Sequence, residues 1–310
     1  MINWFPGHMH KARKEIAEVM PQVDVIIEVI DARIPFSSEN PLVPGLRGNT
    51  PLIKLLNKAD LADPGITQIW IDKMEQDSGV KAIAVSQEKP EQIRALLSLC
   101  ESMVPEKLRS IHPARAMIMG IPNVGKSTII NTLAGRTIAK TGNEAGITKS
   151  QQKIKLDNNI LLTDTPGFLW PKLTPPSCGY RLAITGAIKE TVFEYIEIAF
   201  FAADFLYKNY PDRIKNRYQL DDLPDNDQEI IEAIGRKRGC STKGGRIDLQ
   251  KASTILINEI RAGLLGAISW ETPTMTEAEI AQSKADDEKK RQEKEEADRI
   301  RKLKTKKNRR

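Results

Sequence analysis

Residues 120–127 read GIPNVGKS and match the phosphate-binding pattern GxxxxGK[ST] at every defined position. They follow the apolar run 116–119 and open a helical pattern, which is the strand–loop–helix setting that this pattern requires. Glycines in such a loop let backbone N–H groups turn toward phosphate oxygens, and the start of the helix adds the positive end of a dipole. Lys126 would reach the outer phosphates, and Ser127 would bind Mg²⁺. The segment therefore predicts a site for a nucleoside triphosphate.

Two later segments carry the other groups that a triphosphate with Mg²⁺ needs. Residues 164–167 read DTPG, in which Asp164 would hold Mg²⁺ directly or through water, and Gly167 would offer its N–H to the γ-phosphate. Between the phosphate loop and DTPG, Thr148 lies in a polar, glycine-bearing loop and is the expected second Mg²⁺ ligand of a switch segment. Alone, DTPG is a good turn and Thr148 an ordinary loop residue; the spacing from Ser127 gives them meaning.

Residues 57–60 read NKAD and indicate which base is bound. The Asp60 carboxylate would accept hydrogen bonds from N1–H and the exocyclic amine of guanine, a pair of donors that adenine lacks. Asn57 would tie this loop to the phosphate loop, and the stem of Lys58 would cover the base. After the next apolar run, the backbone N–H of Ser86 would meet guanine O6. The NKxD pattern is short, but beside a complete phosphate site it favours guanine.

The elements that position these loops follow from apolar patterning. Near-continuous apolar runs, many of them β-branched, predict buried strands, separated by helical patterns; this favours a doubly wound α/β fold with a mostly parallel sheet. The predicted strands are residues 23–29, 52–56, 81–85, 116–119 and 160–162, and the predicted helices between them are 65–77, 90–103 and 126–133.

The order of the motifs is unusual, because NKAD and Ser86 precede the phosphate loop, which in turn precedes Thr148 and DTPG. In a typical GTPase the phosphate loop comes first. The same sheet can form with relocated chain ends, since the termini of such folds lie on the surface. We therefore expect a circularly permuted GTPase domain. In this order the segment after DTPG runs directly into the rest of the chain, which predicts that nucleotide state and the orientation of the next domain are coupled.

After residue 177 the pattern becomes helical, with predicted helices at 191–207, 227–233 and 249–263. The first is apolar nearly all round and is expected to be central and buried, and Asp248 is the expected N-cap of the last. The predicted domains are a GTPase domain over 1–176, an all-helical domain over 177–272, and a basic, disordered tail over 273–310.

Charge is concentrated at the C-terminus. The net charge is +6, and residues 284–310 hold 13 basic and 7 acidic residues, so the whole excess lies there. From Arg299 to the end there are eight basic residues and no acidic ones. Such a run suits a polyanion such as RNA. A merely solubilising tail is the other interpretation.

Composition excludes several classes of protein. The chain has 310 residues, 40% hydrophobic and 28% charged, which is ordinary for a globular protein of two domains. Its three cysteines, Cys100, Cys178 and Cys240, are far apart, which argues against a disulfide scaffold or zinc ribbon and fits a reducing compartment. We see no secretory signal and no apolar run long enough for a membrane helix. These features predict a cytoplasmic location and no membrane partner.

Taken together, these motifs resemble the circularly permuted GTPases of the bacterial large-ribosomal-subunit assembly family (YlqF/RbgA type). The resemblance spans about residues 1–272. It implies GTP hydrolysis to GDP and phosphate during assembly of the 50S subunit, contact of the helical domain with 23S rRNA, stimulation of hydrolysis by docking, and a monomer off the ribosome. The segments that carry it are residues 4–9 (WFPGHM), 31–35 (DARIP), 57–60, 120–127, 146–148 (GIT) and 164–167, with Arg238-Gly239, Gly244-Gly245, Asp248, Arg261-Ala262-Gly263 and Gly266 in the helical part.

Catalysis needs a group that the motifs do not supply, because Phe168 stands where many GTPases have a glutamine that orients water. The resemblance marks His8 as that group, acting after docking; a turn residue or an RNA contact is the alternative. In related GTPases with PNVGKS, the asparagine equivalent to Asn123 helps to bind K⁺; a loop-shaping role is the alternative. Arg33 would contact phosphate or RNA, or form a structural ion pair. His10 and His112 are expected to be surface residues.

The predicted sites can be stated as three sets. The nucleotide site comprises Asn57, Lys58, Asp60, Ser86, Asn123, Val124, Gly125, Lys126, Ser127, Thr128 and Gly167. The catalytic set is His8, Lys126 and Thr148. The metal sites are Ser127, Thr148 and Asp164 for Mg²⁺, with Asn123 for K⁺.

Two other functions stay open from the residues alone. The first is a nucleotide-gated RNA-placement factor in which turnover is incidental, and the second is a GTPase of small-subunit assembly. The second class carries an N-terminal barrel and a Cys/His zinc site, and here only 56 residues precede NKAD. The permuted order disfavours a tRNA-modifying GTPase.

Overall fold

The computed structural model describes residues 16–108, 112–139 and 152–307. Its first part is a six-stranded sheet in the order β3-β2-β1-β4-β6-β5, in which β5 alone is antiparallel to its neighbour. The five predicted strands and the doubly wound α/β class are confirmed. The strands are β1 (Val25–Asp31), β2 (Leu52–Asn57), β3 (Val80–Ala84), β4 (Ala114–Gly120), β5 (Gln152–Lys155) and β6 (Ile160–Asp164).

The edge strand β5 was not predicted. Three of its four residues are exposed, and only Ile154 is buried. A polar edge strand lacks the apolar run by which a central strand is found in a sequence. By contrast, every residue of β1 and β2 is buried, because helices cover both faces of the sheet.

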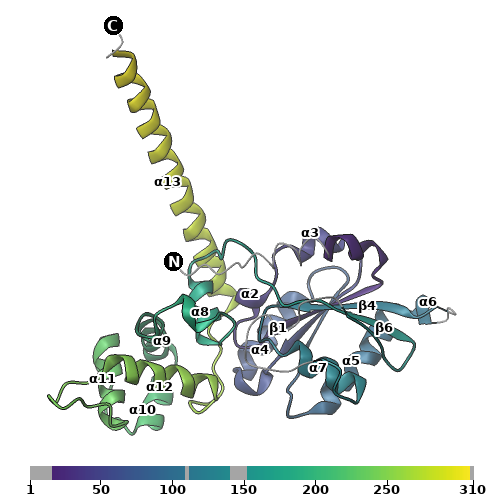
Figure 1. The fold of residues 1–310 in the computed structure, drawn as a ribbon, viewed down its shortest axis with the longest axis horizontal. Coiled ribbons are helices and arrows are strands. Elements are labelled where there is room, and N and C mark those ends of the chain that lie inside the picture. The colour runs from purple at the N-terminus through teal and green to yellow at the C-terminus, as the bar shows by residue number, and fades with distance from the viewer. Residues whose placement is uncertain (1–15, 109–111, 140–151, 308–310) are drawn as a thin grey trace.

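Helices pack on both faces of the sheet (Figure 1). On one face, Ile30 and Leu56 pack against Trp70 and Met74 of α4. On the other, α5 and α7 contact each other through the main core. The helices of this part are α2 (Pro35–Ser38), α3 (Val43–Arg47), α4 (Pro64–Met74), α5 (Pro90–Met103), α6 (Pro105–Leu108) and α7 (Lys126–Ala134), with short 3-10 helices η1 (Met20–Gln22) and η2 (Ala59–Leu61).

Glu28 is an acid fully buried in the middle of β1. Burial, together with the nearby Glu39 carboxylate, raises the pKa of Glu28 from its ordinary 4.5 to about 8, although Lys54 opposes the shift. Its Oε1 accepts from Asn40 N at 2.7 Å, and Oε2 has no hydrogen-bond partner in the described part of the chain. The folded chain therefore binds a proton at Glu28 that the unfolded chain has released at neutral pH.

Substitution of Glu28 tests this arrangement. The stability that the protonated form contributes is fully present below pH 4.5 and is lost as the pH rises toward 8. We expect Glu28→Gln to flatten the fall in unfolding free energy between pH 5 and 8. Urea unfolding of both proteins across this range is the measurement. If the unfolding free energies of the wild type and of Glu28→Gln fell in parallel with pH, the role given to Glu28 would be contradicted. The exposed Glu88→Gln serves as control.

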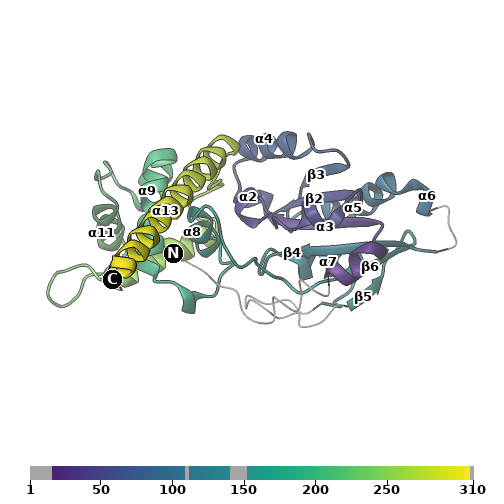
Figure 2. The same cartoon turned by 90° about the horizontal axis from the view of Figure 1, so that it is seen from above.

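The second part of the chain is a bundle of helices beside the α/β part (Figure 2). The three predicted helices are confirmed, and α9 is the central one, since it packs against α8, α10, α11 and α12. Asp248 caps α12 as predicted, accepting from Lys251 N at 2.9 Å. The helices are α8 (Ser177–Ile184), α9 (Tyr195–Asn209), α10 (Pro211–Tyr218), α11 (Asp227–Lys237) and α12 (Leu249–Arg261), with the 3-10 helix η3 (Glu190–Val192).

The chain returns from this bundle to the α/β part before its last helix. Ile268 N donates to Leu61 O at 2.9 Å, and Trp270 N donates to Arg33 O at 2.8 Å. Trp270 is fully buried, and the backbone oxygen of Glu271 accepts from Trp70 Nε1 at 3.1 Å. The helical part is therefore joined to the α/β part at both of its ends.

The predicted disordered tail is corrected by the structure, in which α13 (Pro273–Lys307) is one 35-residue helix that leaves the body (Figure 1). The run of charge and the low complexity predict disorder, but the segment is rich in Ala, Glu, Lys, Gln and Arg, which all favour helix. Its first turns are also docked, with Thr276 buried. Among the described residues, no helix combines the length and apolar character needed to cross a bilayer.

Candidate functional site

The predicted motifs meet at one edge of the sheet, where its parallel strands end. Asp31 ends β1 in register with Asn57 at the end of β2, and Val29 of β1 pairs with Gly120 at the end of β4. Asp164 ends β6 opposite Ile118. The strand order reverses between β1 and β4, since β2 and β3 extend the sheet one way and β6 the other. Ligands of such folds bind at this switch point.

The phosphate loop connects β4 to α7 and has the backbone that anion binding requires. Asn123 and Gly125 are in the left-handed region, with φ of 56° and 100°. Alternating conformations of this kind point successive N–H groups into a concave nest for anions. Helix α7 begins directly after, at Lys126, so its positive end faces the same concavity.

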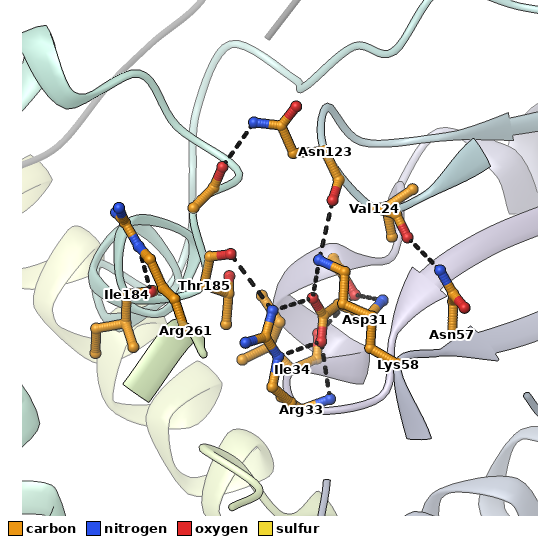
Figure 3. A network of polar contacts seen from close by, with 12 residues as sticks. Asp31, Arg33, Ile34, Asn57, Lys58, Asn123, Val124, Ile184, Thr185 and Arg261 are labelled. Carbon is orange, nitrogen blue, oxygen red and sulfur yellow. Dashed lines mark hydrogen bonds and ion pairs between the residues drawn. The ribbon is translucent and has the colours of Figure 1, made fainter. Parts of the chain in front are cut away.

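The NKAD loop is bound to the phosphate loop, as predicted. Asn57 Nδ2 donates to Val124 O at 2.7 Å. Lys58 Nζ donates to Asn123 O at 3.0 Å and to Asp31 Oδ2 at 3.1 Å, as Figure 3 shows. Burial lowers the pKa of Lys58, and the Asp31 carboxylate counters this shift. The contact with Asp31 was not predicted, because no local pattern indicates that the ends of β1 and β2 share an ion pair.

Arg33 forms the structural ion pair, one of its two predicted alternatives. Its Nε and Nη2 donate to the two carboxylate oxygens of Asp31 at 2.9 and 2.7 Å, and Arg33 is 3% exposed. Burial acts to raise the pKa of Asp31, but Arg33 and Lys58 overcome it and hold that pKa well below its usual range. Arg33 Nη2 also reaches Thr185 O at 3.4 Å, so this pair links the site to the end of α8.

Gly125 must be glycine for two reasons. Its φ of +100° strains any other residue, and an added Cβ would lie 2.2 Å from Asn57 Nδ2. Gly125→Ala is therefore expected to push Asn57 from Val124 and to weaken guanine nucleotide binding more than tenfold. The matched control is Gly135→Ala, at the end of α7, which shares a positive φ of +64° and has nothing within 4 Å of the added atom.

Titration with a fluorescent GDP derivative is the measurement for both variants. A Gly135→Ala protein that binds normally, beside a weakened Gly125→Ala protein, would separate the lost contact from backbone strain. Equal affinities in the two variants would refute the role assigned to the Asn57–Val124 contact.

Lys126 and Asp164 are both buried at the phosphate end, with exposures of 7% and 1%. Burial lowers the pKa of Lys126 and raises the pKa of Asp164, and each group opposes the shift of the other. Asp164 Oδ1 has no hydrogen-bond partner in the described part of the chain. A buried carboxylate oxygen with no donor fits a cation ligand, so Asp164 with Ser127, in the first turn of α7, fits Mg²⁺. Gly167 lies against Pro122 of the phosphate loop.

At the base end, Asp60 is exposed in η2, where it can meet a ligand. Ser86 is 4% exposed, and its N–H donates to Gln92 Oε1 at 3.1 Å, so guanine O6 would have to replace Gln92 there. Thr128 lies within α7, close to Ser127 in sequence. His8, His10 and Thr148 lie outside the described residues.

Phe168 is buried in the core with 2% exposure, so it contributes no polar group to the site.

The structure adds residues that sequence reasoning missed. Asn123 Nδ2 donates to Gly186 O at 2.9 Å, across to the loop after α8. A cavity of about 650 Å³ lies there, bounded by Lys58 and Asn123 on one side and by Lys189 and Arg261 on the other. No local pattern marks such a long-range contact.

The fold and the assembled motifs define a P-loop GTPase. Comparisons with known proteins specify it further. The profile of a family described as "50S ribosome-binding GTPase" matches residues 115–235, and that of "RsgA GTPase" matches residues 39–174.

Relatives that match along almost their whole length point to the same family. "Ribosome biogenesis GTPase A" of Priestia megaterium is 42% identical, covering 89% of this chain and 98% of its own. The protein of the same name from Thermotoga maritima is 30% identical, covering 88% and 95%. The solved structure of GNP-bound YlqF from T. maritima has 28% identity and a TM-score of 0.60, covering 85% and 98%. The chain belongs to the ribosome biogenesis GTPase A family, and it is a GTP hydrolase of ribosome biogenesis.

Proposed function

We propose that this GTPase acts in assembly of the large (50S) ribosomal subunit and that docking on the particle stimulates hydrolysis. The description of the family that matches residues 115–235 supports the choice of the large subunit. The helical part, residues 177–272, is the proposed contact with 23S rRNA, and residues 1–176 are the proposed GTPase domain. The proposed setting is the cytoplasm, with a monomer off the ribosome.

The observation that carries the proposal is the hydrogen bonding of the helical part to the phosphate loop and to residues beside the NKAD loop. Asn123 of the phosphate loop donates to Gly186, and the Asp31–Arg33 pair beneath Lys58 reaches Thr185. On the base side, Ile268 donates to Leu61, next to the NKAD loop. A change in the conformation of either nucleotide loop therefore favours a change in the orientation of the helical part. A partner that binds the helical part in one orientation favours the matching conformation of the loops.

In the proposed reaction, water attacks the γ-phosphorus, the bond to the β–γ bridging oxygen breaks, and GDP and phosphate leave. Lys126 and the loop N–H groups hold the charge that develops on the phosphate oxygens. Ser127, Asp164 and Thr148 would hold Mg²⁺, which would neutralise phosphate charge when bound. Since the Phe168 side chain cannot hydrogen-bond water, His8 is proposed to orient it after docking on the particle.

Asn123 is the proposed K⁺ ligand. With Nδ2 donating to Gly186, Oδ1 is the atom that would bind the cation. A K⁺ beside the phosphates would supply the positive charge that an arginine finger supplies elsewhere. The interdomain bond would then fix the orientation of the ligand amide.

The test is GTP turnover by the purified protein in KCl and in NaCl, alone and with 50S or 30S subunits. We expect slow turnover alone, stimulation by 50S only, and higher rates in K⁺. Stimulation by 30S would support the small-subunit alternative. Absence of stimulation by mature and immature 50S particles alike would support a placement factor with incidental turnover. His8→Ala should keep nucleotide binding and lose the stimulation.

A further inference from the structure

The net charge of helix α13 changes sign along its length. Residues 273–298, here called the stalk, contain nine acidic and five basic residues. Residues 299–310, the tip, contain eight basic residues and no acidic one. One continuous helix spans the stalk and runs into the tip as far as Lys307. The two segments therefore differ in the kind of surface that each can bind.

The acidic stalk is bound by the protein itself. Arg181 Nη2 donates to Glu279 Oε1 at 2.7 Å, and Lys172 Nζ donates to Asp287 Oδ2 at 2.8 Å. Ser177 Oγ donates to the same Glu279 at 2.6 Å. Lys172 belongs to the segment that follows DTPG, and Ser177 and Arg181 lie in the next helix, α8. The root of α13 is thus fixed to the chain that leaves the γ-phosphate loop.

The tip lies far from this root. A helix rises about 1.5 Å per residue, so Lys307 is about 30 Å beyond Asp287, the last of these contacts. Figure 1 shows the far half of α13 running away from the body. No acidic residue within the tip neutralises its charge. The sequence of the tip therefore places a concentration of positive charge at the far end of α13.

We propose that the tip is an RNA-binding arm that contacts the phosphate backbone of the ribosomal particle, aimed by the stalk. This inference rests on the proposed function, since the particle supplies the RNA. An anionic membrane fits less well, because an interfacial helix needs an apolar face and the tip has only Ile300 and Leu303. Phosphate contacts need only charge within reach.

The experiment uses salt dependence in the full-length chain. The tip variant carries Arg301→Gln, Lys302→Gln, Lys304→Gln and Lys306→Gln. The matched stalk variant loses as many charges from the same helix, by Lys289→Gln, Lys290→Gln, Arg291→Gln and Lys294→Gln. Binding to 50S precursor particles is measured by sedimentation from 50 to 300 mM KCl with a non-hydrolysable GTP analogue.

Each phosphate contact contributes about 0.9 to the slope of log K against log salt. With four contacts removed, the tip variant should lose about 3.6 from this slope and bind at least tenfold more weakly at 50 mM KCl, while the stalk variant matches the wild type. Equal loss in both variants, or an unchanged tip variant, would overturn the proposal. So would tip-dependent binding to phosphatidylserine vesicles without any tip-dependent binding to RNA.

A second probe separates this inference from the proposed function. A 30-base-pair RNA duplex alone should bind the wild type and the stalk variant better than the tip variant. If no particle binds but the duplex result holds, the proposed partner is wrong and the arm stands. If particles bind and stimulate turnover equally in all three proteins, and the duplex does not distinguish them, the arm is refuted and the function stands.

Discussion

Replacing Lys126 with alanine is expected to lower kcat/KM for GTP by about a thousandfold, the scale seen when one preorganised charge-stabilising group is removed. Lys126 is 7% exposed at the start of α7, so water screens its charge only weakly. The control is Lys155→Ala, which removes an exposed lysine from β5. Steady-state phosphate release with each protein is the measurement, and a loss of less than tenfold would contradict the role given to Lys126.

In Lys126→Ala, the Mg²⁺ concentration needed for nucleotide binding should also depend on pH. Burial raises the pKa of Asp164, and Lys126 is the charge that opposes this. Without Lys126 the pKa of Asp164 rises further, so protons compete more strongly with Mg²⁺ for the carboxylate and more Mg²⁺ is needed. We expect the Mg²⁺ concentration for half-maximal nucleotide binding to fall as the pH is raised from 6 to 9. A wild-type Mg²⁺ requirement in Lys126→Ala would show that the two groups are not coupled.

How much of this site could be predicted depends on the range of the contact. The phosphate loop, NKAD and DTPG are local patterns, and parallel strands bring their ends to one edge, so the amino-acid sequence alone sufficed to assign Asn57 to the phosphate loop, where it binds Val124. The Asn123–Gly186 bond joins residues 63 positions apart, and nothing local to either residue marks it. The roles of His8 and Thr148 remain predictions, because these residues lie outside the described segments.

Helices α8 and α10 show the same limit in the fold. Arg181 is fully buried in α8, and a charged residue at a core position breaks the apolar periodicity by which a helix is found. Its burial makes sense only with Glu271 and Glu279, which are 90 and 98 residues further along the chain. In α10, five of the eight residues are charged or amide residues, and only Ile214 and Tyr218 are buried.

Loss of Arg181 should therefore cost the protein much stability. Its guanidinium binds Glu279, lies 3.5 Å from the fully buried Glu271, and donates from Nε to Trp270 O at 2.9 Å. Breaking a buried pair leaves an uncompensated charge, so Arg181→Met should lower the unfolding free energy by about 3–5 kcal/mol. Urea unfolding at pH 7 is the measurement, with the exposed Lys208→Met as control.

The loss of unfolding free energy in Arg181→Met should be larger at high pH than at low pH. Burial raises the pKa of Glu271 above its ordinary 4.5, and Arg181 is the largest opposing influence. Without Arg181 that pKa rises further, so the stability contributed by the protonated carboxyl is full below pH 4.5 and is lost as the pH rises. The deficit of Arg181→Met should therefore shrink between pH 8 and pH 5. The double variant with Glu271→Gln should recover most of the loss at pH 8, since it removes the charge that Arg181 balances. A deficit independent of pH and unrelieved by Glu271→Gln would mean that Arg181 stabilises the protein through packing and through Glu279 instead.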